Sequence, residues 1–210
     1  MSEQSLHNLT SHLKSDHFVT INVGPPDGNN ISVKIQQSVL EATSEWFVAA
    51  LKQYRWLEGQ TRTISFPEDD PALWSLFIHW VIRRELPPST QDWRTMARCW
   101  LLGDKYNISR FQDICMARTM RNLAVHHGQP APIARDLPAT KTLILDTPPN
   151  CALMRLLGEE VALALLEGNL RLEHLKALDG TDGFWSRCLE ARMKIEELVT
   201  EFLSGNRSSS

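Results

Sequence analysis

The strongest pattern of apolar and polar positions in this chain runs from Thr63 to Glu85. Residues Thr63–Phe66 alternate as a half-buried strand does, and an acidic turn, Glu68–Asp70, follows them. Asp70 suits the N-cap of a helix that begins at Pro71, because its carboxylate can accept hydrogen bonds from the first turn. The apolar residues of this helix recur at three- and four-residue steps and predict one broad buried stripe: Leu73, Trp74, Phe77, Trp80 and Val81.

Two earlier segments also carry the alternation of strands. Phe18–Gly24 and Ile31–Ile35 flank a dense turn signal at residues 25–30, so this region predicts a β-hairpin. Gly24 and the two prolines after it do not form a phosphate-binding loop, because the Gly-Lys-Ser/Thr ending that grips phosphate is missing.

Helical periodicity occupies three further segments before residue 122. Gln37–Lys52 predicts two short helices, and Ser44 suits the cap of the second. Asp92 suits another N-cap, and the cleanest amphipathic spacing of the chain follows it: Trp93, Met96, Ala97, Trp100 and Leu101. The run from Gly103 to Asn107 predicts the end of that helix. Ser109 and Gln112 predict a capping box for the next one.

Beyond Asn122 the chain changes character. Residues 123–149 are rich in proline and predict a linker that packs as extended chain, with a brief β segment at Leu143–Leu145. Residues 150–204 predict a helical extension. Its last helix, Phe184–Leu203, is expected to turn one apolar set inward: Trp185, Cys188, Leu189, Ile195, Leu198, Val199 and Phe202. Residues 1–17 are a separate N-terminal segment, whose thin helical stripe indicates either a frayed tail or a helix that finds its apolar partner on another subunit. Residues 205–210 are expected to form a disordered tail.

Charge and composition argue against two classes of partner. The net charge is −3, which gives no electrostatic case for binding nucleic acid or an anionic membrane. No apolar run approaches the roughly 18 residues that suggest a transmembrane helix. The polar N-terminus also lacks the apolar centre of a signal peptide. We therefore expect a cytoplasmic or nuclear protein with no nucleic-acid or membrane partner.

No cofactor, metal or catalytic site is expected either. The four cysteines form no CxxC pair, and the seven histidines do not supply clustered ligands. Glu68–Asp70 suits either a metal or acid–base cluster or a solvated turn that caps a helix, and we adopt the second interpretation. No serine lies in a GxSxG turn of the kind that exposes a nucleophile. These observations predict a protein that is not an enzyme.

Four runs of sequence, in this order and spacing, carry a family resemblance: Val19–Ile35, Val39–Leu51, Thr63–Val81 and Cys99–Met116. Together they resemble the BTB/POZ domain, in the variety common in fungal proteins, over residues 18–122. The resemblance implies an α+β fold with a small three-stranded sheet and a cluster of helices, followed here by the helical C-terminal extension.

The resemblance also implies a protein-interaction module that binds a copy of itself. The candidate dimer interface consists of Leu6, Leu9 and Leu13, at helical spacing in the N-terminal segment, together with Phe18. Trp93 and Tyr106 mark a candidate partner surface, which in a cullin adaptor would face the cullin.

Two alternative functions stay open at this point. One is a substrate adaptor of a cullin-type ubiquitin ligase, although residues 87–91 lack the hydrophobic-x-Glu motif of such adaptors. The other is a nuclear co-regulator of transcription. Its action would be indirect, because the sequence contains no element that reads DNA.

Overall fold

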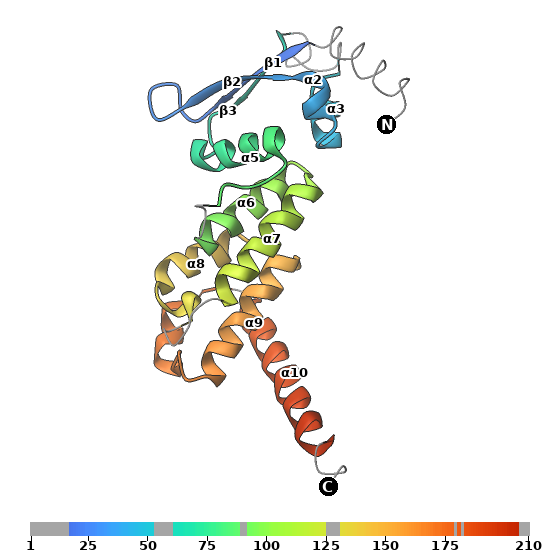
Figure 1. Cartoon of the computed structure of the whole chain (residues 1–210). Helices are drawn as coiled ribbons and strands as arrows, with labels where there is room; N and C mark the ends of the chain where they lie inside the picture. The colour runs from blue at the N-terminus through green and yellow to red at the C-terminus, as the bar shows by residue number, and fades with distance from the viewer. Residues whose placement is uncertain are drawn as a thin grey trace. The chain divides into compact units, whose positions relative to one another are not determined.

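The computed structural model of the chain describes residues 17–52, 61–88, 92–124, 131–178, 180–181 and 183–205 (Figure 1). The chain forms two compact units. The first comprises Met1–Thr90 and Arg98–Cys115, and the second comprises Gln91–Ala97 and Met116–Ser210. This division differs from the predicted boundary at residue 122, because two continuous helices each contribute residues to both units. The architecture is α+β, as predicted.

A three-stranded sheet opens the first unit. Strands β1 (Phe18–Val23) and β2 (Ile31–Gln36) form the predicted antiparallel hairpin, and β3 (Thr63–Phe66) pairs with β1 in parallel, giving the order β2-β1-β3. The alternation of apolar residues sets the face that each strand buries. Val19, Ile21 and Val23 are fully buried, while Phe18 is on the opposite face and is exposed.

Helix α5 (Pro71–Arg83) packs its apolar stripe into the core of the first unit. All five residues of the predicted stripe are buried, and Asp70 caps the helix by accepting a hydrogen bond from the amide of Ala72 at 2.8 Å. The helix ends at Arg84, which adopts a left-handed conformation with φ 60°. Glycine is the usual residue at such a C-cap. Here the Arg84 guanidinium lies 5.6 Å from the centre of the Trp80 ring.

Two short helices precede β3. Helix α2 (Gln37–Glu41) is followed by α3 (Glu45–Ala50), and Ser44 caps α3 by accepting from the amide of Trp46, as predicted. Phe47 is fully buried and stacks on Phe77 of α5 with a ring separation of 6.2 Å. Residues 53–60, between α3 and β3, lie outside the described residues.

Helices α6 (Trp93–Lys105) and α7 (Ser109–Ala124) follow. Asp92 caps α6 as predicted, since its carboxylate accepts from the amides of Arg94 and Thr95. Helix α6 ends at Lys105, within the run from Gly103 to Asn107 where its end was predicted. Gly103 is helical and buried, and a methyl group there would lie 2.7 Å from Gln112 Cγ on α7.

The capping box expected at Ser109 and Gln112 is wrong. Ser109 is the first residue of α7, and the Gln112 side-chain amide donates to Asp104 at 3.1 Å. Gln112 therefore links α7 back to the last turn of α6 and does not reach the start of its own helix.

In the second unit, the predicted extended linker at residues 123–149 is wrong for much of its length. It contains the 3₁₀ turn η1 (Pro132–Ala134) and helix α8 (Leu137–Asp146), which Asp136 caps by accepting from the amide of Ala139. Leu143–Leu145 are helical and do not form a β segment. Pro138 does not break α8 because it occupies the first turn, where a proline amide would have no partner to lose.

The predicted helical extension at residues 150–204 consists of three elements: α9 (Ala152–Leu166), the 3₁₀ segment η2 (Leu172–Leu178) and α10 (Phe184–Gly205). Helix α9 is the centre of this unit, with eight buried residues along its length. The expected inward face of α10 is only partly correct. Cys188 is buried, but Leu189 and Leu198 are 61% and 57% exposed. The side chains of Val199 and Phe202 lie outside the described part.

Gly24 provides a test of the turn that leaves β1. Its φ is +91°, and an added Cβ would lie 2.4 Å from the carbonyl oxygen of Asn29 and 2.7 Å from Pro71 Cγ. We expect Gly24→Ala to lower the free energy of unfolding by about 2–4 kcal/mol, from left-handed strain plus the clash. Gly168→Ala is the matched control, because Gly168 has a φ of +74° but no atom within 4 Å of the added Cβ. It should cost only about 1–2 kcal/mol. If urea unfolding shows the same loss of stability for both variants, the predicted clash at Gly24 is refuted.

Candidate functional site

The candidate dimer residue Phe18 lies on the outer face of the sheet and is 59% exposed. Its neighbours on that face of β1 are Thr20 and Asn22, and Ser32 of β2 donates to the Asn22 side chain at 2.7 Å. Phe18 is therefore an exposed aromatic residue on an otherwise polar face. The other three candidate dimer residues, Leu6, Leu9 and Leu13, lie outside the described residues.

The acidic turn between β3 and α5 was interpreted as solvated, but one of its carboxylates is not. The side chain of Asp69 is 8% exposed and accepts three hydrogen bonds. Oδ2 accepts from the indole Nε1 of Trp74 at 2.8 Å and from the Tyr106 hydroxyl at 2.5 Å. Oδ1 accepts from Lys105 Nζ at 2.6 Å. The turn is thereby tied to α5 and to the end of α6.

The pKa of Asp69 is lowered by this arrangement. Burial acts to raise the pKa, but the hydrogen bonds from Lys105, Tyr106 and Trp74 outweigh it. The pKa of the Tyr106 phenol is raised, first by burial, then by its hydrogen bond to Asp69 and by the negative charge of that carboxylate. A carboxylate held ionised by three donors is a poor proton acceptor. The cluster is suited to holding elements together and not to acid–base chemistry.

The neighbouring carboxylate, Asp70, has a different environment. One oxygen caps α5, and the other accepts from Arg98 Nη2 of α6 at 3.1 Å, in an ion pair that is largely exposed. Exposed pairs of this kind contribute little to stability. Within the described part of the chain, no three His, Cys, Asp or Glu side chains are placed to hold a metal ion.

Tyr106 does not offer its side chain to a partner, contrary to its prediction as a partner-surface residue. It is 4% exposed, and its ring lies 4.9 Å from that of Trp46, 5.0 Å from Phe66 and 5.5 Å from Trp74. Its backbone carbonyl also accepts from the buried hydroxyl of Ser44 at 2.6 Å. The residue is an internal link between α3, the β3–α5 turn and α6, because each of these elements contacts it.

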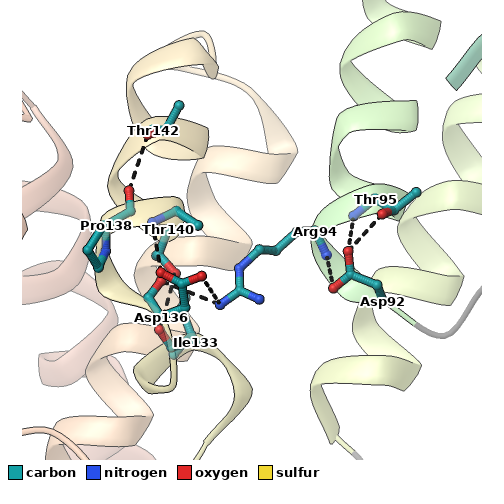
Figure 2. Close-up of polar contacts among 9 residues, drawn as sticks. Asp92, Arg94, Thr95, Ile133, Asp136, Pro138, Thr140 and Thr142 are labelled. Carbon is teal, nitrogen blue, oxygen red and sulfur yellow. Dashed lines mark hydrogen bonds and ion pairs between the residues drawn. The ribbon is translucent and has the colours of Figure 1, made fainter. Parts of the chain in front are cut away.

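Trp93, the second predicted partner residue, is also buried, and it belongs to the other compact unit. The guanidinium of Arg94 lies 5.0 Å from the centre of the Trp93 ring. Figure 2 shows Arg94 reaching from α6 toward Asp136, the N-cap of α8. Arg94 Nη2 donates to the Asp136 carbonyl at 3.4 Å and lies 3.8 Å from its carboxylate. This pair fastens the first turn of α6 to α8. Trp93 belongs to the same turn, and its side chain is buried in the second unit.

The same close-up explains why α8 begins where it does. The Thr140 hydroxyl is buried and lies within hydrogen-bond distance of two carbonyl oxygens, those of Ile133 and Asp136 (Figure 2). Sequence periodicity did not reveal this role, because a buried threonine in a proline-rich run looks like loop composition. The signal that could have found α8 is the local pattern Asp136-Leu137-Pro138, an N-cap followed by proline in the first turn.

The buried thiols have no sign of activation. Cys99 and Cys115 are both fully buried, and the pKa of Cys115 is raised by its hydrogen bond with Cys99 and by burial. Burial raises the pKa of Cys188 to about 12. Because the thiolate is the reactive form, the raised pKa values keep Cys115 and Cys188 unreactive. Cys151 instead caps α9, where its sulfur accepts from the amide of Met154 at 3.3 Å.

The Asp69 cluster can be tested with Asp69→Asn, which keeps the shape of the side chain but removes its charge. We expect a loss of about 2–3 kcal/mol in the free energy of unfolding near pH 7, because Lys105 and Tyr106 then lose a charged acceptor. Urea unfolding measures this loss. Asp70→Asn is the matched control, because asparagine still caps a helix well and the Arg98 pair is exposed. It should cost well under 1 kcal/mol.

The pH dependence gives a second measurement on the same variants. The pKa of Asp69 is lower in the folded chain than its ordinary value of 3.8, so its contribution to stability is present above about pH 4. That contribution is lost as the pH falls toward the lowered folded pKa. The stability difference between the native chain and Asp69→Asn should therefore shrink below pH 4. A difference that stays constant down to pH 2 would refute the charge-based explanation.

Comparisons with known proteins do not assign a family to this chain. No protein-family model matches it, and no curated protein matches it. Within the part of the chain that the structure describes, no helix is long and apolar enough to cross a membrane.

Proposed function

We propose that this chain is a non-enzymatic protein-interaction module of the BTB/POZ type, which binds a copy of itself and recruits a protein partner. Support comes from the order of elements in the first unit. A hairpin is followed by a helix pair, a third strand parallel to the first, and then the helices α5, α6 and α7. The four runs that carry the family resemblance coincide with these elements.

The observation that carries self-association is the exposure of Phe18. A phenylalanine that is 59% exposed on a polar sheet face leaves apolar area in contact with water. Phe18 is joined through His17 to the N-terminal segment that contains Leu6, Leu9 and Leu13. Exchange of such a segment between two copies is a low-cost route to a dimer, because the same apolar side chains find equivalent partners in the second copy.

We propose that the protein has no enzymatic activity, because the polar groups in the described part of the chain are not arranged for catalysis. The best-organised polar group, Asp69, already accepts three hydrogen bonds and holds three elements together. The buried thiols Cys115 and Cys188 have raised pKa values. A nucleophile or general base needs a neighbour that activates it, and neither group has one.

The dimer can be tested with the full-length triple variant Leu6→Ser, Leu9→Ser and Leu13→Ser. We expect the variant to raise the dissociation constant of the dimer formed through Phe18 at least tenfold, because the leucines would form its crossing face. Sedimentation equilibrium at tens of micromolar measures this constant. Removal of residues 206–210 is the control, since it shortens the chain at the other end. A native chain that is monomeric at tens of micromolar would refute this dimer.

The cullin-adaptor alternative predicts a complex that we do not expect to form. Tyr106 and Trp93, around which a cullin would dock, are both buried, and residues 87–91 carry no hydrophobic-x-Glu motif. In a pull-down of the full chain with the cullin of the same organism, we expect no retention above background. An adaptor with the motif serves as the positive control. Specific retention of the cullin would overturn this expectation.

A further inference from the structure

Helix α10 continues well past the elements that support it. The helix has 22 residues and is roughly 33 Å long. Its first turns pack on α9, where Gly158 allows a close approach: a methyl group there would lie 3.2 Å from Arg187 Cβ. Phe184 and Cys188 are buried in this region. Beyond Cys188, no α10 side chain that the structure describes is buried, and Figure 1 shows the helix (red) extending past α9.

The apolar residues of α10 continue in a regular pattern beyond this support. They recur at alternating steps of four and three residues, which is the heptad spacing of a coiled coil: Phe184, Cys188, Ala191, Ile195, Leu198 and Phe202. The first two contact the protein's own core. Ala191 and Ile195 are half-buried, and Leu198 is 57% exposed. We call the face made by Ala191, Ile195 and Leu198 the α10 seam.

The outer half of α10 has no buried side chain among those that the structure describes. Most of the stability of a helix in a protein comes from packing of its apolar face, and isolated helices shorter than about 12–15 residues are marginal in water. The ion pair between Arg192 and Glu196, at 2.9 Å, adds only a few tenths of a kcal/mol. A second helix laid along the seam would bury the exposed apolar area.

We propose that the α10 seam binds the α10 seam of a second copy, in antiparallel orientation. The seam is complementary to itself in this orientation, because Ile195 lies opposite Leu198 of the partner and Leu198 opposite the partner's Ile195 by symmetry. The small Ala191 then faces the heptad position of the large residue Phe202. The two flanking positions on one side of the seam carry Lys194 and Glu201, which pair across the two-fold axis.

A parallel pairing fits the sequence less well. It would place Arg187 of one copy beside Arg192 of the other, and Lys194 beside the uncharged Val199. Like charges at these flanking positions oppose association. The seam is short, so we expect its interface to lie below the size of a standard stable complex and its association to be weak.

This interface is independent of the N-terminal one in the proposed function. Each is isologous and uses a different surface, so a chain with both would link dimers into larger assemblies. The full-length Leu6/Leu9/Leu13→Ser variant weakens the N-terminal surface while leaving α10 intact. Self-association that remains in that variant measures the α10 interface alone, and the two proposals can therefore fail separately.

The direct test places charges on the seam with Ile195→Glu and Leu198→Glu, in the triple-serine background. We expect sedimentation velocity to show at least a tenfold weaker self-association. The matched control is Leu189→Glu with Met193→Glu, since these residues are 61% and 64% exposed on the same helix but lie off the seam. The control should associate as before. Equal losses in both double variants, or no loss in the seam variant, would overturn the proposal.

A charge exchange tests the orientation without adding charge to the seam. Lys194→Glu should weaken association several-fold, because it places glutamates opposite Glu201 of the partner. Adding Glu201→Lys to the same chain should restore association, since each antiparallel pair then again joins opposite charges. Helicity measured by circular dichroism checks that both variants fold. If the second substitution fails to restore association in folded protein, the antiparallel arrangement is refuted.

Discussion

The buried carboxylate of Asp69 is the interaction on which the first unit depends most. The side chain of Asp69 lies in the β3–α5 turn and is only 8% exposed. It accepts hydrogen bonds from Trp74, Lys105 and Tyr106. An ionised group removed from water is stable only while its hydrogen-bond partners stay in place. The contacts therefore hold the β3–α5 turn, helix α5 and the end of α6 together. The rings of Trp46, Phe66 and Trp74 then pack around the ring of Tyr106.

This arrangement restricts where a partner can bind. Tyr106 and Trp93, which the family resemblance marks as surface residues, are part of the packing of their own units. Exposed apolar side chains elsewhere in the described residues include Phe18 on the sheet and Leu189, Met193 and Leu198 on the outer half of α10. Both regions leave apolar area in contact with water, and we propose that a second copy covers each of them. These surfaces are the basis of the proposed self-association.

Periodicity predicted the sheet and the central helix well. The alternation in Phe18–Gly24 and the stripe from Leu73 to Val81 depend on side-chain direction, which repeats with the backbone. The caps at Ser44, Asp70 and Asp92 were also predictable, since a cap is a contact between near neighbours. Helix α8 was missed because its proline was interpreted as a breaker and its buried Thr140 as loop composition. The close approach of Gly103 to Gln112 of α7 could not be predicted from the sequence, because it involves a residue outside its own helix.

The sequence by itself determined which face of each strand and helix is apolar and where most helices begin. Only the tertiary structure decided what covers each face. The carboxylate of Asp69 is buried while that of Asp70 remains partly exposed, although the two are adjacent. Along α10, one heptad pattern passes from the buried Cys188 to the exposed Leu198 without any change in spacing. The physical reason is that periodicity records the direction of a side chain, whereas burial depends on neighbours that are distant in the chain.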